Sequence, residues 1–146
     1  MAIVQCVPDS ALLDFAQGTM DYRIAGDTFK MALYYASATL NTSTTAYTTS
    51  GEVVGTGYTA GGEILTSVDP VISNNKTIFD WADRNFTTVT LVDVAGALIY
   101  NSSKSNAAVL VIKFAAPISA TAKTLSVTFP GATSTSAIIR LRQVNG

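Results

Sequence analysis

Histidine is absent from the 146 residues of this sequence. Because histidine is the most frequent general base in enzymes and a common zinc ligand, its absence excludes a Ser–His–Asp triad and a histidine zinc site. Cys6 is the single cysteine, which excludes an intrachain disulfide and a cysteine metal cluster. No cationic neighbour is predicted to activate its thiol, so we expect Cys6 to be a small buried hydrophobic residue.

Charged residues are also scarce, at 13% of the chain, where soluble domains carry about 25%. The net charge is −1 and the nine basic residues are scattered, so we expect no nucleic-acid partner. Only Arg140 and Arg142 are close together, and on a strand they would share one face. We interpret that face as a solvated or interface surface in preference to a phosphate site.

Long hydrophobic runs are missing as well. The longest ones, such as residues 107–112, are too short to span a bilayer, so we expect no membrane partner. No signal-peptide pattern is visible, and synthesis in the cytoplasm is expected. The chain instead contains 20 Thr and 13 Ser, neutral polar residues that suit strands, turns and surfaces in contact with other protein. The length fits one domain, residues 1–146.

One short helix is predicted between Pro8 and Gly18. Asp9 or Ser10 is expected to cap its first turn, and Gly18 suits the position just after its last residue. An apolar stripe is expected from four side chains, namely Leu12, Leu13, Phe15 and Ala16. Residues 1–7 are apolar and are expected to form an N-terminal arm or a short strand.

Most of the remaining chain has the composition and alternation of strands. Phe29, Met31, Leu33 and Tyr35 are predicted to share one face of a strand. Turn and breaker signals at Ala95-Gly96 and at Pro117 are expected to end strands. The expected strands are residues 28–35, 39–47, 63–68, 71–73, 77–81, 86–94, 97–100, 107–114, 124–129 and 137–144. Such a series of short strands predicts a mainly all-β fold, an antiparallel β-sandwich or jelly-roll-like domain with one short N-terminal helix.

The segment Gly55-Thr-Gly57-Tyr58-Thr-Ala-Gly61-Gly62 is the densest glycine cluster. A phosphate-cradling loop would need a following helix or a Gly-Lys-Ser/Thr sequence, and neither is present. We interpret the glycines as structural, since they permit positive φ and close backbone approach, with Tyr58 packing inward. A subunit interface is the expected location of this loop.

Two other groups of side chains were considered for chemistry. Asp80 and Asp83 flank Trp81, but acids three positions apart in a loop are more simply interpreted as caps of backbone groups than as a glycosidase pair. Trp81 and the tyrosines could form a sugar-binding platform, although aromatics at strand spacing are more often core residues. No calcium-loop pattern is present. We therefore expect no enzyme, no metal and no cofactor.

Several segments resemble a family of small structural proteins of tailed bacteriophages. The resemblance covers nearly the whole chain, and its sharpest motifs are Asp27-Thr-Phe-Lys30 with Ala32-Leu33, and Gly55-x-Gly57-Tyr58-x-x-Gly61-Gly62. It implies a virion component, and a capsid decoration or cement protein on the exterior of the head in particular. The implied partners are the major capsid protein and further copies of this chain, with a trimer favoured over a dimer. The family supplies no catalytic residue to transfer.

Two alternatives remain open at this point, a tail, neck or fibre-associated structural protein and a glycan-binding attachment module. The N-terminal segment is also expected to add a strand to the sheet edge of a neighbouring subunit. The interface candidates are Met1, Ala2, Ile3, Val4, Gly55, Gly57, Tyr58, Gly61 and Gly62.

Overall fold

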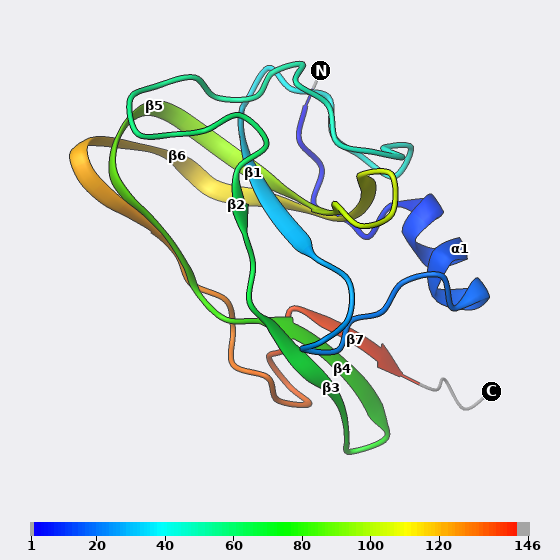
Figure 1. Cartoon of the computed structure of the whole chain (residues 1–146). Coiled ribbons are helices and arrows are strands. Elements are labelled where there is room, and N and C mark those ends of the chain that lie inside the picture. The colour runs from blue at the N-terminus through cyan, green and yellow to red at the C-terminus, as the bar shows by residue number, and fades with distance from the viewer. Residues whose placement is uncertain (1, 143–146) are drawn as a thin grey trace.

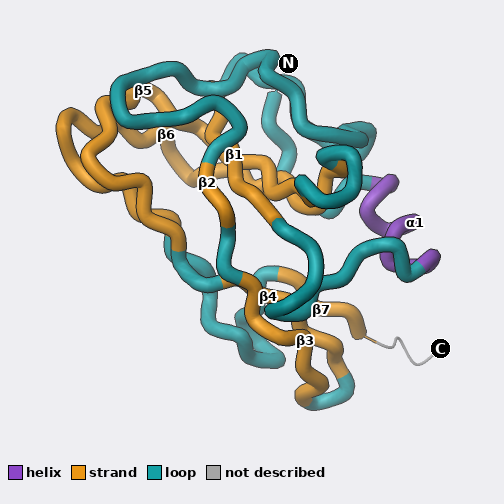
Figure 2. Tube along the Cα trace, in the orientation of Figure 1, coloured by secondary structure: helices purple, strands orange, loops and turns teal. Residues whose placement is uncertain are grey.

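The computed structural model describes residues 2–142, which form one helix and two antiparallel sheets (Figures 1 and 2). This confirms the prediction of a mainly β protein with one short helix. The four-stranded sheet has the order β2-β1-β5-β6, and the three-stranded sheet has the order β3-β4-β7. The elements are α1 (Asp9–Gln17), β1 (Phe29–Tyr35), β2 (Glu63–Ile64), β3 (Ser67–Ser73), β4 (Lys76–Trp81), β5 (Arg84–Asn101), β6 (Ala107–Val127) and β7 (Ile139–Arg142).

Strand β1 lies between β2 and β5, and both of its faces are buried. Phe29, Met31 and Leu33 enter the larger hydrophobic cluster, as their alternation predicts. The opposite face was not expected to be buried, yet Ala32 and Tyr34 belong to a second cluster. The N-terminal segment and the loop after β1 cover that face, and this cover depends on contacts that a strand's own periodicity cannot reveal.

Strands β5 and β6 form one long curved hairpin along the side of the molecule (Figure 1). The predicted breaks at Ala95-Gly96 and at Pro117 are therefore wrong. Pro117 is tolerated because residues 114–117 have no partner in the register of β6 with β5, so its missing N–H falls at an unpaired position. Gly96 is needed for close packing, since a Cβ there would lie 2.5 Å from Ile112 O. Several register shifts along the ladder accommodate the curvature.

The segment 39–47 forms a loop instead of the expected strand. Local hydrogen bonds compete with sheet formation here, because the Ser43 N–H donates to Asn41 Oδ1 at 2.8 Å and the Asn41 N–H donates to Thr44 Oγ1 at 2.9 Å. Isolated bridges at Leu40 and Ala46 and single hydrogen bonds, such as that from the Asp9 N–H to Thr42 O, connect the loop to neighbouring chain segments in place of a ladder. The last expected strand, 137–144, is shorter in the structure, and its final two residues lie outside the described part of the chain.

Helix α1 ends as predicted, since Gly18 follows it with a φ of 64°. The predicted cap is wrong, because Pro8 precedes the first helical residue and no side chain caps the turn. The predicted stripe is also wrong for Leu12, Leu13 and Ala16, which are exposed, Leu12 by 49% and Leu13 by 56%. The helix packs through Ala11 and Phe15 instead.

Aromatic rings connect α1 to both sheets. The Phe15 ring stacks on Tyr22 with a centroid separation of 5.0 Å, and Tyr22 stacks on Phe29 of β1 at 4.9 Å. Tyr22 also meets Phe79 of β4 edge-on at 4.8 Å, and Phe29 meets Trp81 of β4 at 5.5 Å. Such ring pairs stabilise a fold beyond the hydrophobic burial of their surface. This stack therefore fixes how the helix and the two sheets pack together.

Candidate functional site

The glycine-rich loop of residues 55–62 packs against β1 and β5 of its own chain. A Cβ on Gly55 would lie 2.1 Å from Thr90 O, and one on Gly57 would lie 2.5 Å from Thr88 O. Gly62 is closer still to β1, where a Cβ would lie 1.8 Å from the carbonyl oxygen of Met31. The predicted close backbone approach is therefore real but intramolecular. The close packing within the chain accounts for the glycines, and the interface expected at this loop stays a prediction.

A buried carboxylate, which sequence analysis did not identify, anchors this loop. Glu52 is 7% exposed and accepts three hydrogen bonds, from Tyr47 Oη at 2.6 Å, Tyr58 Oη at 2.7 Å and the Gly61 N–H at 2.7 Å. The Tyr100 hydroxyl donates to Gly61 O at 2.7 Å. A buried carboxylate is tolerated when its lone pairs are satisfied in this way. The one sequence signal was an isolated acid between Ser50-Gly51 and Val53-Val54.

Tyr58 packs inward, as predicted, with its ring against the larger cluster. Its hydroxyl also accepts a hydrogen bond from the Leu33 N–H at 3.0 Å, so it joins Glu52 to the middle of β1. Burial raises the pKa of Tyr58 well above that of a free tyrosine, and burial likewise raises the pKa of Tyr47. Both phenols remain neutral donors near pH 7, which suits a structural role.

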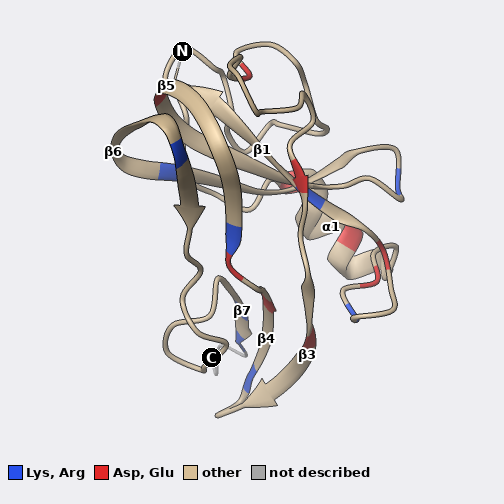
Figure 3. Ribbon diagram, turned by 60° about the vertical axis from the view of Figure 1, so that its left-hand side comes forward, with Lys and Arg blue, Asp and Glu red and all other residues tan. Residues whose placement is uncertain are grey.

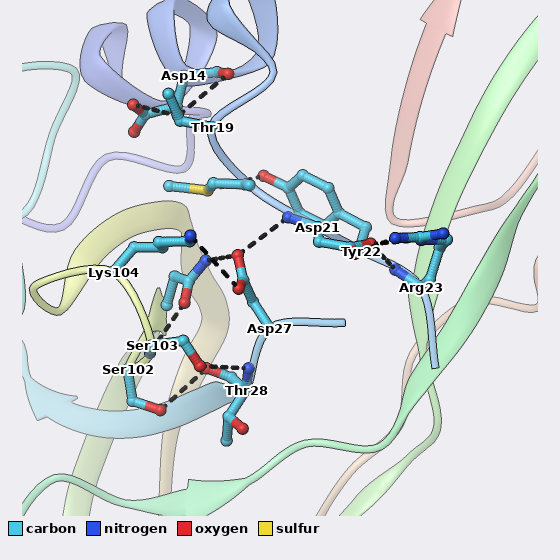
Figure 4. A network of polar contacts seen from close by, with 12 residues as sticks. Asp14, Thr19, Asp21, Tyr22, Arg23, Asp27, Thr28, Ser102, Ser103 and Lys104 are labelled. Carbon is cyan, nitrogen blue, oxygen red and sulfur yellow. Dashed lines mark hydrogen bonds and ion pairs between the residues drawn. The ribbon is translucent and has the colours of Figure 1, made fainter. Parts of the chain in front are cut away.

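The second motif, Asp27-Thr28, joins the loop before β1 to the turn between β5 and β6 (Figure 4). Asp27 Oδ2 accepts hydrogen bonds from the Asp21 N–H at 2.9 Å and from Asn101 Nδ2 at 2.8 Å, and the Thr28 N–H donates to Ser103 Oγ at 2.9 Å. Asn101 is fully buried. The motif therefore holds two loops together, which agrees with its interpretation as structural.

The N-terminal segment lies on the chain itself. The Val4 N–H donates to Leu40 O at 2.8 Å, and the side chain of Ile3 is 3% exposed. Cys6 exchanges two hydrogen bonds with Val111 of β6, at 3.1 and 2.9 Å. These backbone groups are therefore already paired and do not offer a strand to another subunit.

These contacts leave fewer of residues 1–4 available for the interface expected there. The side chains of Ala2 and Val4 face outward, and Val4 is 50% exposed. Ile3 belongs to the second hydrophobic cluster, and Met1 lies outside the described residues.

The two acids near Trp81 both bind backbone groups. Asp80 Oδ1 accepts from the Trp81 N–H at 2.8 Å, and Asp83 Oδ1 accepts from the Phe129 N–H at 2.7 Å. Burial raises the pKa of Asp80. Trp81 is 3% exposed, so it offers no ring to a sugar. The interpretation of these acids as backbone caps therefore agrees with the structure.

The thiol of Cys6 lacks the features of a nucleophile. It is partly buried, and burial together with the nearby Asp9 raises its pKa, whereas a reactive thiol has a lowered one. Within residues 2–142, no cluster of three His, Cys, Asp or Glu residues could hold a metal ion. The helix in that range is too short and too polar to cross a membrane.

Comparison with protein-family models, with curated proteins and with solved structures finds no match to this chain. The surface is the remaining source of functional information. Among residues 2–142, twelve large hydrophobic side chains are exposed, and four of them, Val68, Val71, Ile72 and Leu141, lie on the small three-stranded sheet. Ile72 pairs with Thr77 and Thr77 pairs with Leu141, so the three form one row on one face.

Proposed function

We propose that this chain is a non-enzymatic structural protein of a bacteriophage virion that decorates the icosahedral capsid and stabilises it by bridging neighbouring capsomers. The observation that carries the proposal is the exposed apolar surface of the three-stranded sheet in a chain with only 13% charged residues. Ile72 is 83% exposed and Leu141 is 40% exposed, and the two flank Thr77 in one row across the sheet. Apolar surface of this kind is typical of contacts with other protein.

The mechanism is mass action. A protein that binds only the assembled shell stabilises that state by an amount set by its concentration and affinity. An oligomer that engages several capsomers gains avidity without further contacts in each subunit. A homotrimer on the exterior of the head, bound to the major capsid protein, meets both requirements. No catalytic residue, cofactor, nucleic acid or membrane takes part.

The copy ratio of this chain to the major shell protein in purified particles tests the proposal. Quantitative mass spectrometry should give a ratio near unity that is retained in heads without tails. A few copies per particle, lost together with the tail, would refute capsid decoration and leave the tail, neck or fibre alternative.

The docking surface is tested by replacing both apolar residues of the row, Ile72→Ser with Leu141→Ser. We expect loss of binding to particles with little change in stability, because surface substitutions usually alter stability by less than about 0.5 kcal/mol. The matched control is Val92→Ser on β5, which is 58% exposed and lies outside the three-stranded sheet. Equal binding of the double variant and the control would exclude this surface. Glycan-array binding by the wild-type chain would instead favour the attachment module.

A further inference from the structure

Basic residues occur on both β4 and β7 of the three-stranded sheet, whose positions along the ribbon are coloured in Figure 3. Lys76 of β4 lies directly opposite Arg142 of β7, and Arg140 lies opposite Ile78. Because paired and alternate residues share a face, Lys76, Arg140 and Arg142 all project from the same side of the sheet. This is the face opposite the row of Ile72 and Leu141.

These three side chains line a hollow of about 310 Å³. Like charges directly opposite each other on neighbouring strands are destabilising. None of the three forms an ion pair with any acid among residues 2–142. The hollow is therefore a concentration of positive charge that the described part of the chain does not neutralise.

The loop before β7 holds two of the cations in place. Lys76 Nζ donates to Ser134 O at 2.8 Å, and Arg140 Nη1 donates to Thr135 O. Ser134 is 6% exposed, and its hydroxyl accepts a hydrogen bond from Asn74 Nδ2 at 2.9 Å. A lysine has three donors and an arginine five, so both retain donors that are free to bind a ligand. Positioning the donors in advance lowers the entropic cost of binding.

Arg140 and Arg142 alone predicted a solvated or interface surface, but folding adds Lys76 to them. We propose that the hollow formed by these three residues binds a dianionic oxyanion of the phosphate or sulfate class. Arginine forks match the oxygens of such an anion, and charge-assisted hydrogen bonds are the strong ones. The other six basic residues are scattered, so the surface offers one compact cluster and no track for a polymer. The cluster is independent of the apolar row, and the proposal does not rest on the capsid role.

Thermal unfolding at constant ionic strength tests the site. Inorganic phosphate should raise the Tm of the wild-type chain above its value in chloride, because a ligand that binds the folded state stabilises it. The double variant K76Q/R142Q should lose this response and bind phosphate at least about tenfold more weakly in calorimetric titration. The matched control K113Q/K123Q removes the same charge from exposed positions on β6 and should keep the response.

Equal Tm values in phosphate and chloride, or equal losses in both double variants, would overturn the proposal. If K76Q/R142Q does not fold, phosphate titration of the wild-type chain, followed by the NMR shifts of its backbone amides, still tests the proposal. Shifts centred on Lys76, Ser134, Thr135 and Arg140 support the site, and shifts elsewhere or dispersed over the surface refute it. Phenyl phosphate is a second probe. Tighter binding of phenyl phosphate than of inorganic phosphate indicates a ligand with a phosphoryl group on a larger molecule, and otherwise the ligand is a free anion.

Discussion

Replacing Gly62 by alanine should be among the most damaging single changes in the loop of residues 55–62. Gly62 has a φ of +70°, and a Cβ at this position would lie 1.8 Å from Met31 O, 2.5 Å from Met31 C and 2.7 Å from Ala32 Cα. The obstructing atoms are backbone atoms of β1, the strand between β2 and β5, so they cannot turn aside as a flexible side chain would.

The magnitude has two parts. A left-handed conformation costs an alanine about 1–2 kcal/mol. Overpacking that forces the backbone to shift typically costs a further 1–3 kcal/mol. Moving the loop away from β1 would also disturb the short pairing of Lys30 with Ile64 and Met31 with Glu63. We therefore expect Gly62→Ala to lower the free energy of unfolding by about 2–5 kcal/mol, a large part of the stability of a small domain.

Gly18→Ala is the matched control. Gly18 has a similar φ of +64°, but nothing lies within 4 Å of a Cβ built there. Only the conformational cost of about 1–2 kcal/mol should remain. Urea unfolding followed by the fluorescence of Trp81, the one tryptophan and 3% exposed, measures both variants. Equal losses in the two would refute the argument that contact with β1 makes this glycine necessary.

Three further predictions concern the anchor of the loop and the N-terminal segment. Glu52→Gln replaces an acceptor of the Tyr47 hydroxyl by a donor and should cost about 1–3 kcal/mol in urea unfolding; unchanged stability would mean that the carboxylate is no anchor. Burial raises the pKa of Tyr58, so its phenol stays neutral in the folded state while the unfolded chain ionises above about pH 10, and stability should fall as pH rises beyond that value. Tyr58→Phe should reduce this slope by up to about 1.4 kcal/mol per pH unit, and parallel wild-type and variant curves from pH 9 to 12 would contradict the assignment. Ile3→Ala should cost about 2–5 kcal/mol, whereas Val4→Ala on the exposed side of the same segment should cost less than about 0.5, as thermal unfolding of both variants will show.

Strand ends and side-chain burial both depend on the neighbouring segments of the fold. Local signals at Ala95-Gly96 and Pro117 predict strand ends, but whether a strand continues depends on what pairs beside it. Pro117 lies in the stretch 114–117 of β6 that has no partner on β5, and Gly96 is required by the close approach of Ile112. Leu12 and Leu13 were predicted to be buried because they are apolar, yet Phe15 occupies the contact with Tyr22 and β4.

The candidate site shows the same division. The presence of glycines at 55–62 indicates positive φ and close approach, because both are properties of a residue without a Cβ. The sequence pattern does not predict which atoms these glycines approach. The structure shows that they are Met31 O, Thr88 O and Thr90 O of the same chain. Glu52 was missed because its three donors, 5, 6 and 9 residues away, lie in a loop whose conformation follows no helix or strand periodicity.

Composition and periodicity alone determined the mainly β character, the single helix with its glycine terminus, the buried face of β1 and the scarcity of groups for catalysis. These are local or additive properties, set by the φ preferences, side-chain alternation and chemistry of each residue. Only the tertiary structure decided the two-sheet division, the long hairpin of β5 and β6, the pairing of the N-terminal segment within the chain and the meeting of Lys76 with Arg142. Each of these depends on contacts between residues far apart in sequence, whose register is fixed when the whole chain packs.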